Sequence, residues 1–228
     1  MTSVIAVANI AGGTHKTTTA HALAVATVEY GKKVLLIDLD PRADLTFNLG
    51  YERARATIVE MLQGASISQS NDITTDERFD FIGTDSRLAS LNSVDALKTF
   101  LTSLPNQYDL VIIDTPAQID SRVAMAFTAA DAIVIPTDGS VHGIRGAINT
   151  AKIASNAQKF ILPCGGFTTE HAALFTDHTV LDAHIPMYSV IDAAIATKRS
   201  VLSVDKSSDF SEAYREVSYS LLEHLKFF

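Results

Sequence analysis

The sequence predicts an α/β protein: a single doubly wound domain over residues 1–228, with one mostly parallel, twisted sheet and helices on both faces. Two observations support this prediction. Short continuous apolar runs, rich in β-branched residues, recur at 4–8, 34–37, 110–113 and 132–136, as expected for parallel strands covered on both faces. The stretches between these runs have helical patterns, and strands that alternate with helices form parallel sheets.

Composition sets the broad class of protein. The chain has 228 residues, of which 47% are hydrophobic, so it is large enough for one domain with a substantial core. No apolar run reaches the roughly 20 residues of a spanning helix, and the N-terminus lacks a basic-then-apolar signal. The only cysteine, Cys164, excludes an intramolecular disulfide, so we expect a cytoplasmic protein. The net charge of −8 argues against a surface that binds nucleic acid all over, but it permits a local basic patch.

A glycine-containing loop follows the first apolar run. It reads ANIAGGTHKTTT from Ala8 to Thr19 and leads into an alanine-rich helical stretch. A strand, a tight loop and a helix that opens on Lys-Thr-Thr are typical of phosphate binding, because loop N–H groups and the helix N-terminus attract anions. Lys16 would add a charge near the outer phosphates, and the Thr17 hydroxyl would ligate Mg²⁺. The candidate nucleotide-binding residues are Ala11, Gly12, Gly13, Thr14, His15, Lys16, Thr17 and Thr18.

This loop departs from the common pattern G-x-x-x-x-G-K-[ST], because Ile10 and His15 stand where glycine is usual. With Gly12 and Gly13 inside the loop, the arrangement resembles the deviant phosphate loop of the ParA/MinD family of dimeric ATPases. An ordinary Gly-Gly turn before a helix is the alternative. The resemblance implies a P-loop NTPase fold of the ParA-like kind, which uses ATP and Mg²⁺.

Carboxylates end two of the predicted strands. Asp38 and Asp40 end the second apolar run and Asp114 ends the third, at the edge where open α/β sheets bind ligands. Both motifs resemble those of the family, although Arg42 and Asp44 replace the usual Gln and Asn. The resemblance implies that Asp38 supports the Mg²⁺ shell and Asp40 orients the attacking water; helix capping is the alternative. The candidate catalytic residues are Lys16, Asp40 and Asp38, and the candidate metal ligands are Thr17, Asp38 and Asp114.

The other expected elements carry less chemistry. They are short helical structure within 45–63, a surface loop over 64–76, a strand at 79–83, one helix from Asp85 to about Leu104, a helix from about Gly143 to Asn156 and a fifth strand at 160–163. The stretch from Lys198 to Val217 again resembles ParA-like chains. The resemblance therefore spans nearly the whole length, and it is weakest over 159–184.

One family residue is missing from the loop. In most ParA/MinD proteins the first lysine of the loop reaches the partner's nucleotide across a dimer, and here Ala11 takes its place. A cation elsewhere would have to substitute if two protomers enclose the nucleotide. Arg145, Asn149 and Lys152 share one helical face, so Lys152 is the first trans-dimer candidate and Arg145 the second. A solvated polar stripe is the alternative.

Basic residues gather late in the chain. The resemblance implies an ATP-bound dimer that binds nonspecific double-stranded DNA, which requires several Lys and Arg on one face. Pairing of Arg215 with Glu212 or Glu216 on its own helix is the alternative for that residue. The candidate DNA-binding residues are Lys198, Arg199, Lys206 and Arg215.

The resemblance thus implies a nucleoid-associated ATPase switch that positions or segregates a carboxysome, plasmid or chromosome, with an McdB-like or ParB-like protein as cargo adaptor or ATPase stimulator. Loss of the loop lysine resembles the McdA subgroup, which spaces carboxysomes. One rival is a MinD-like membrane-positioning ATPase, although the C-terminal helix lacks the basic polar face that membrane binding requires, so we expect no membrane partner. Another rival is a metabolic ATP-dependent enzyme of the same fold.

Overall fold

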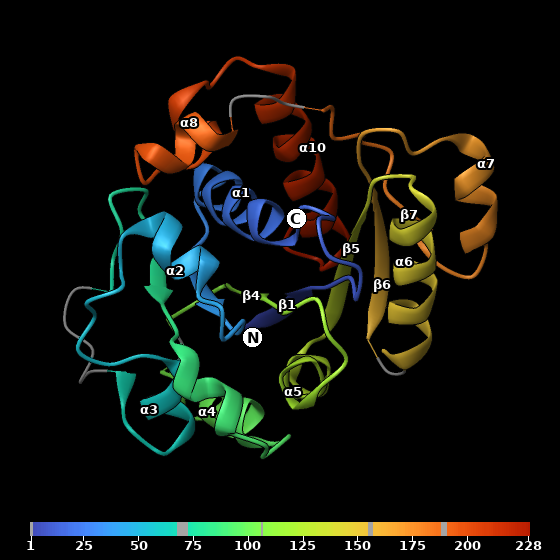
Figure 1. Cartoon of the computed structure of the whole chain (residues 1–228). Coiled ribbons are helices and arrows are strands. Elements are labelled where there is room, and N and C mark those ends of the chain that lie inside the picture. Colours follow the sequence, from blue (N-terminus) through green and yellow to red (C-terminus); the bar gives the residue numbers. More distant parts are fainter. Residues whose placement is uncertain (1, 68–72, 106, 155–156, 188–190) are drawn as a thin grey trace.

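The computed structural model of the chain describes residues 2–67, 73–105, 107–154, 157–187 and 191–228 (Figure 1). Within them, seven strands form one sheet in the order β3-β2-β4-β1-β5-β6-β7, and all neighbouring strands in it are parallel. The predicted parallel α/β sheet is confirmed. The strands are β1 (Ser3–Val7), β2 (Val34–Asp38), β3 (Asp80–Ile82), β4 (Leu110–Asp114), β5 (Ala132–Thr137), β6 (Gln158–Pro163) and β7 (Thr179–Val180).

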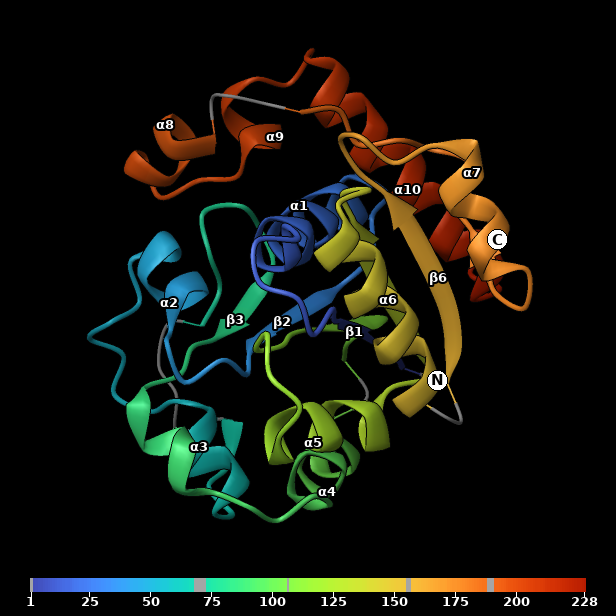
Figure 2. The same cartoon turned by 45° about the vertical axis from the view of Figure 1, so that its right-hand side comes forward.

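Helices cover both faces of this sheet (Figures 1 and 2). The longer ones are α1 (Lys16–Glu29), α4 (Ala96–Ser103), α5 (Ser121–Ala129), α6 (Val141–Ile153) and α10 (Asp209–His224). The shorter ones are α2 (Asp44–Leu49), α3 (Ile58–Leu62), α7 (Thr169–Ala172), α8 (Ile191–Ala196), α9 (Val201–Val204) and the 3-10 turns η2 (Ser86–Ser90) and η3 (Ala173–Phe175).

The strands divide their side chains between two cores. Along β1, Ile5 and Val7 pack in one core with α1 and α10, whereas Val4 and Ala6 pack in the other with α3, α4, α5 and α6. This alternation follows from the two-residue period of a strand. It explains why the sequence shows continuous apolar runs, since both faces of each central strand are buried.

The expected helix from Asp85 to Leu104 is wrong. The 3-10 turn η2 ends at Ser90, Leu91 is extended, and α4 begins only at Ala96. Leu88 is buried as its pattern predicts, but Val94 is 38% exposed, so the spacing of three does not continue into one buried helical face. Asp85 caps η2 by accepting a hydrogen bond from the N–H of Arg87, which stabilises a short turn at this place.

The last helix belongs to the core. Phe210, Tyr214, Val217 and Leu221 of α10 are buried, and α10 packs along α1. The Tyr214 hydroxyl lies 2.8 Å from that of Thr19 on α1. In the part of the chain that the structure describes, no helix is both long and apolar enough to cross a membrane.

Candidate nucleotide and metal site

The carboxyl ends of the central strands bring the predicted site together. Val7 of β1 and Asp38 of β2 both lie in register with Asp114 of β4, which stands between them in the sheet. The loops that follow these strands therefore meet at one edge. The phosphate loop, the two strand-ending aspartates and the start of α1 are neighbours in space, as the sequence predicts.

The phosphate loop closes on itself before α1 begins. The Lys16 Nζ donates to the carbonyl of Ala11 at 2.9 Å, and the Thr14 hydroxyl donates to the same carbonyl at 3.2 Å. Gly13 and His15 both have left-handed backbone conformations, with φ of 75° and 62°. His15 thus adopts the conformation for which glycine is usual, which histidine tolerates better than most residues.

The start of α1 is suited to an anion. His15 stands at the N-cap and makes no side-chain capping bond, and the first turn, which lies wholly within the described residues, contains no acidic side chain. Its backbone N–H groups therefore keep their positive partial charge for a ligand. Lys16 is only 8% exposed, and burial lowers its pKa, while the nearby Asp114 and Asp40 act in the opposite sense.

The two strand-ending aspartates differ in their partners. Asp38 is fully buried and accepts three hydrogen bonds, from the Asp40 N–H, the Thr46 N–H and the Thr46 hydroxyl. Burial raises its pKa to about 7, against the lowering effect of those bonds. Asp114 is 1% exposed, and both of its carboxylate oxygens lack a hydrogen-bond partner among the described residues.

Asp114 supplies the test for a metal. Burial raises its pKa well above the ordinary value, the charge of Asp38 adds to this rise, and Thr17 and Lys16 act in the opposite sense. A buried carboxylate without donors is costly unless a cation or ordered water satisfies it. Oxygen ligands and retained water are what Mg²⁺ prefers. Asp114 and Thr17 therefore fit a magnesium site, whereas the oxygens of Asp38 already hold the adjoining loop.

Asp40 lies in the loop between β2 and α2. Its carboxylate accepts the N–H of Arg42 at 3.0 Å, and the side chains of Arg42 and Asp44 form an exposed ion pair. Ala43 closes the loop with φ of 58°. Arg42 and Asp44, the two departures from the family motif, therefore contact each other at the surface.

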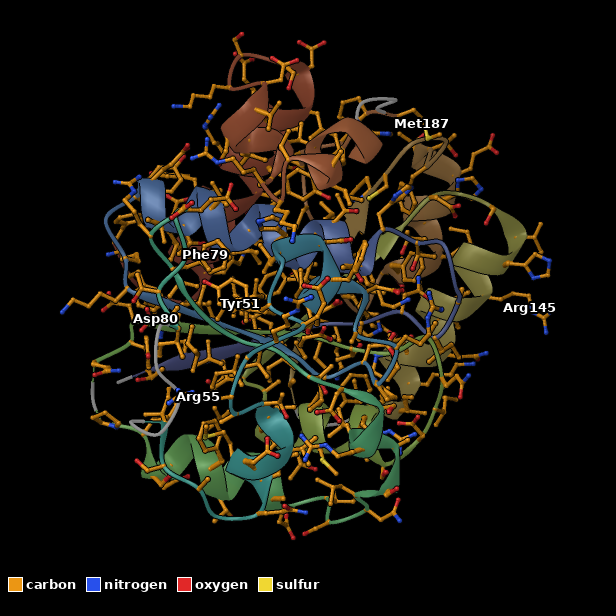
Figure 3. All side chains as sticks on the ribbon, turned by 60° about the vertical axis from the view of Figure 1, so that its left-hand side comes forward. Tyr51, Arg55, Phe79, Asp80, Arg145 and Met187 are labelled. Carbon is orange, nitrogen blue, oxygen red and sulfur yellow. The ribbon has the colours of Figure 1, made fainter. Side chains whose placement is uncertain are left out.

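Helix α6 approaches the phosphate loop closely at Gly146. A Cβ atom at this position would lie 2.7 Å from the Cβ of Ala11 and 2.2 Å from the Asn9 carboxamide oxygen, so only glycine fits without a shift. Arg145 and Ala11 line the same open cleft of about 490 Å³. Figure 3 shows Arg145 on the outer side of α6. Lys152 is exposed two turns further along, outside this cleft.

The late basic residues have different surroundings. Arg215 pairs with Glu29 of α1, with 2.6 Å between Nε and Oε2, and it also donates to the carbonyl of Lys206. It therefore pairs across two helices and not with Glu212 or Glu216 of its own helix. The aliphatic part of Lys198 lies over Gly50. Arg199 lines a small pocket together with Thr17 and Thr18.

A buried polar network escaped the sequence analysis. His21 Nε2 of α1 lies 2.5 Å from the carboxylate of Glu77, which also accepts hydrogen bonds from the N–H of Ser200 and the hydroxyl of Ser203. Glu77 comes from the loop before β3 and Ser200 caps α9. The network thus fastens the segment that carries Lys198 and Arg199 to the helix that starts at the phosphate loop. Its members are up to 182 residues apart, and no short motif signals such a contact.

Fold and site define a nucleotide-binding α/β protein with a phosphate loop. A family model described as an AAA domain matches residues 2–162. The chain is 30% identical over 167 residues to the sporulation initiation inhibitor protein Soj of Bacillus subtilis, and this aligned region covers 67% of the chain and 66% of Soj. It is 32% identical over 158 residues to the maintenance of carboxysome distribution protein A (McdA) of Synechococcus elongatus, covering 65% and 63%. The chain belongs to the ParA/MinD family of P-loop ATPases.

A solved structure matches nearly the whole chain. Cobyrinic acid a,c-diamide synthase from Mycobacterium smegmatis with bound ADP and magnesium has a TM-score of 0.77 and 29% identity, over 99% of this chain and 96% of that one. The matches to the two named relatives are shorter, and the chain spans about two thirds of their length.

Proposed function

We propose that this chain is an ATP-dependent, dimerising ATPase switch that binds nonspecific DNA and positions or segregates an intracellular cargo. The observation that carries the ATPase part is the register of Asp38 and Asp114 beside the phosphate loop, with the Asp114 carboxylate buried and without a hydrogen-bond partner among the described residues. The positioning part is supported by the similarity to Soj and McdA.

The chain's own residues suffice for phosphoryl transfer to water, which needs mainly positioning and charge stabilisation. The loop N–H groups and Lys16 would bind the phosphates, and Asp40 would orient the attacking water from the loop after β2. Thr17 and Asp114 would hold Mg²⁺, with Asp38 supporting them through the loop. When bound, Mg²⁺ neutralises charge on the β- and γ-phosphates. Lys16→Ala should abolish hydrolysis, and unchanged ATP turnover would refute this assignment.

Dimerisation would bring a cation to the partner's nucleotide. The cleft beside Ala11 places Arg145 close to where the missing lysine would begin, and Lys152 lies about 10 Å further along the helix axis. We therefore expect Arg145→Ala to weaken ATP-dependent dimerisation more than Lys152→Ala. Light scattering after size exclusion, with a nonhydrolysable ATP analogue, measures this. Full dimerisation of both variants would contradict the trans-cation role.

DNA binding is tested first on nonspecific duplex with ATP, ADP or no nucleotide over a salt series. We expect retention only with ATP, and a steep loss with salt because each phosphate contact releases counterions. A Lys198, Arg199 and Lys206 triple alanine variant should lose retention, and Lys98→Ala on α4 is the matched control. Arg215 is left out because it pairs with Glu29. Retention on DNA that is the same with and without nucleotide, or that is unchanged by the triple substitution, would overturn the proposal.

A metabolic ATP-dependent enzyme is the second candidate. The nearly full-length similarity to the M. smegmatis synthase favours it. Such an enzyme forms a product besides ADP and phosphate, so incubation with ATP and the substrate of that synthase distinguishes the two candidates. The MinD-like membrane alternative has less support, because Phe210, Tyr214, Val217 and Leu221 of α10 are in the core. Sedimentation with anionic liposomes tests it directly.

The cargo adaptor is expected to be McdB-like or ParB-like, and the location is expected to be cytoplasmic and nucleoid-associated. Both expectations come from the family relatives and depend on the DNA result. Microscopy of the tagged chain before and after the triple substitution tests the location. A diffuse signal for both forms would contradict nucleoid association.

A further inference from the structure

Thr46, in the first turn of α2 just beyond the loop that follows β2, is a residue to which the proposed function gives no role. It is 1% exposed. Its hydroxyl donates to Oδ2 of Asp38 at 2.7 Å and accepts the N–H of Thr84 at 2.9 Å. Its own N–H donates to the same Asp38 oxygen at 3.0 Å. A buried hydroxyl that uses both its donor and its acceptor is expensive to disturb.

These bonds close the loop that carries Asp40. The Asp40 N–H donates to Oδ1 of Asp38 at the start of the loop, and Thr46 donates to Oδ2 at its end. Five residues, 41–45, therefore run between two attachments to one carboxylate. Inside the loop, the N–H of Arg42 fixes the Asp40 carboxylate. The position of Asp40 thus depends on both attachments.

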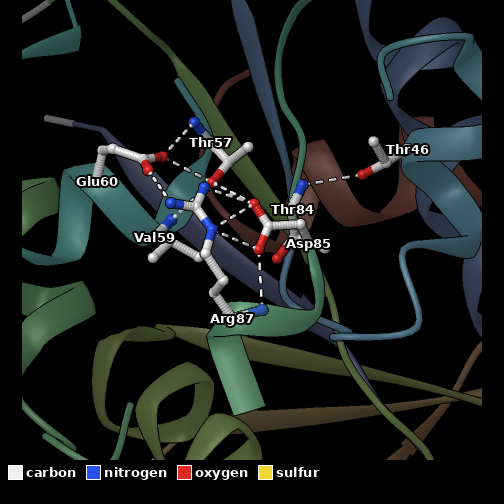
Figure 4. A network of polar contacts seen from close by, with 7 residues as sticks. All are labelled: Thr46, Thr57, Val59, Glu60, Thr84, Asp85 and Arg87. Atoms are coloured by element: carbon white, nitrogen blue, oxygen red, sulfur yellow. Dashed lines mark hydrogen bonds and ion pairs between the residues drawn. The ribbon is translucent and has the colours of Figure 1, made fainter. Parts of the chain in front are cut away.

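The second bond of Thr46 fixes the loop to the rest of the sheet. Figure 4 shows the Thr84 N–H directed at the Thr46 hydroxyl, next to the turn where Asp85 pairs with Arg87. Gly83 packs against Thr46 so closely that a Cβ there would lie 2.9 Å from Cγ2 of Thr46. Thr46 is therefore held between β2 and the end of β3.

We propose that Thr46 is a positioning residue for ATP hydrolysis: its hydroxyl, held between Asp38 and the backbone of Thr84, keeps the 40–45 loop in the conformation that presents Asp40 to the phosphate loop. This inference rests on the proposed ATPase activity and on the proposed role of Asp40. Removing the hydroxyl would break its bonds to Asp38 and to Thr84 and leave only the Thr46 N–H to hold this end of the loop, while the phosphate loop itself stays intact.

The main test is Thr46→Val, which replaces the hydroxyl by a methyl group of similar shape. Losing a hydrogen bond that orients a residue of the site typically lowers activity about tenfold or more. We expect kcat to fall about tenfold, the Kd for ATP to change less than twofold, and amides in 39–47 of the nucleotide-free protein to exchange faster. Thr46→Ser keeps the hydroxyl and should restore both kcat and exchange protection.

The matched control is Thr27→Val. Thr27 is 2% exposed, and its hydroxyl bonds to that of Ser218 between α1 and α10, away from the loop. The Thr27→Val substitution should lower the melting temperature without changing kcat or the amide hydrogen exchange of residues 39–47. If Thr46→Val does not fold, Gly83→Ala retains the Thr46 hydroxyl but displaces it, since a Cβ at position 83 would lie 2.9 Å from Cγ2 and 3.0 Å from Oγ1 of Thr46, and the same losses are expected.

Two results would overturn the inference. One is wild-type kcat and wild-type exchange in Thr46→Val and Gly83→Ala. The other is a loss of kcat that follows the melting temperature equally in Thr46→Val and Thr27→Val, which would make the effect one of stability alone. Asp40→Ala separates this inference from the proposed function: if it leaves hydrolysis unchanged, the role of Asp40 is wrong, whatever Thr46 does.

Discussion

Two buried carboxylates that oppose each other in register should make the nucleotide-free protein less stable as the pH rises. The perturbation that we consider is Asp114→Asn, which removes one of the two charges and keeps the shape. Asp38 and Asp114 are Cα partners across β2 and β4, and burial raises the pKa of both. Because their folded-state pKa values are above the unfolded ones, the folded state holds more protons, and stability is lost as pH rises through the folded pKa.

Asp38 gives the scale of the loss for one such buried carboxylate. A shift from an ordinary value of 3.8 to about 7 corresponds to at most about 4 kcal/mol, at about 1.4 kcal/mol per pH unit. This loss falls between about pH 4 and pH 7. For a chain of this length, 1 kcal/mol moves the melting temperature by about 2–4 °C, so a difference of several degrees is expected.

The assay is thermal unfolding without nucleotide or metal at pH 4 and pH 8, by circular dichroism. Asp114→Asn should come close to the wild type at pH 4 and exceed it at pH 8, because the neutral amide removes the Asp114 carboxylate, whose pKa is raised by burial and by the charge of Asp38. Asp177→Asn, an exposed substitution, serves as the control for a generic change of charge. Equal pH dependence of wild type and Asp114→Asn would refute the reasoning. Mg²⁺ with ADP should reduce the pH dependence of the wild-type melting temperature, because a bound cation offsets the buried negative charge.

Further predictions concern packing and buried groups. Gly146→Ala should raise the Kd for ATP about tenfold, because the added Cβ pushes against Ala11 of the phosphate loop. The overpacking costs about 1–3 kcal/mol, whereas alanine in place of glycine stabilises a helix by about 1 kcal/mol. A more stable variant with an unchanged Kd would contradict this. Glu77→Ala should cost about 3 kcal/mol in urea unfolding, since it leaves His21 and two donors unpaired; a loss below 1 kcal/mol would count against a structural network. Burial raises the pKa of Cys164 to about 12, so alkylation by iodoacetamide at pH 8, followed by mass spectrometry, should be negligible in the folded chain; rapid alkylation would show that the site opens.

The parts of the molecule that the sequence predicts well depend on local patterns. The strands β1, β2, β4 and β5 are buried on both faces, so each is a continuous apolar run. The phosphate loop and the aspartates that end β2 and β4 are short motifs whose meeting follows from parallel topology. The class of fold, and the meeting of these loops at one edge of the sheet, can therefore be derived without coordinates.

The parts that the sequence misses depend on contacts between distant segments. The break in the helix expected from Asp85 to Leu104 reflects capping by Asp85, which a three-residue spacing does not reveal. Arg215 pairs with Glu29, 186 residues away, although closer carboxylates flank it on its own helix. The close approach of Gly146 to the phosphate loop depends on how α6 lies across the end of β1. Each of these contacts is decided by packing.

The same long-range contacts connect the two loops that follow β2 and β4. At the start of segment 84–92, the Thr84 N–H donates a hydrogen bond to the Thr46 hydroxyl. At its end, the carbonyls of Ala89 and Leu91 accept hydrogen bonds from Arg122 and Ser121, which begin α5 after the loop that follows Asp114. A rearrangement of either loop must therefore either break its hydrogen bonds to this segment or move the segment with it. The turn after β3 thus connects the loop that carries Asp40 and the loop beyond Asp114 through hydrogen bonds, although it contains no residue of the candidate nucleotide site.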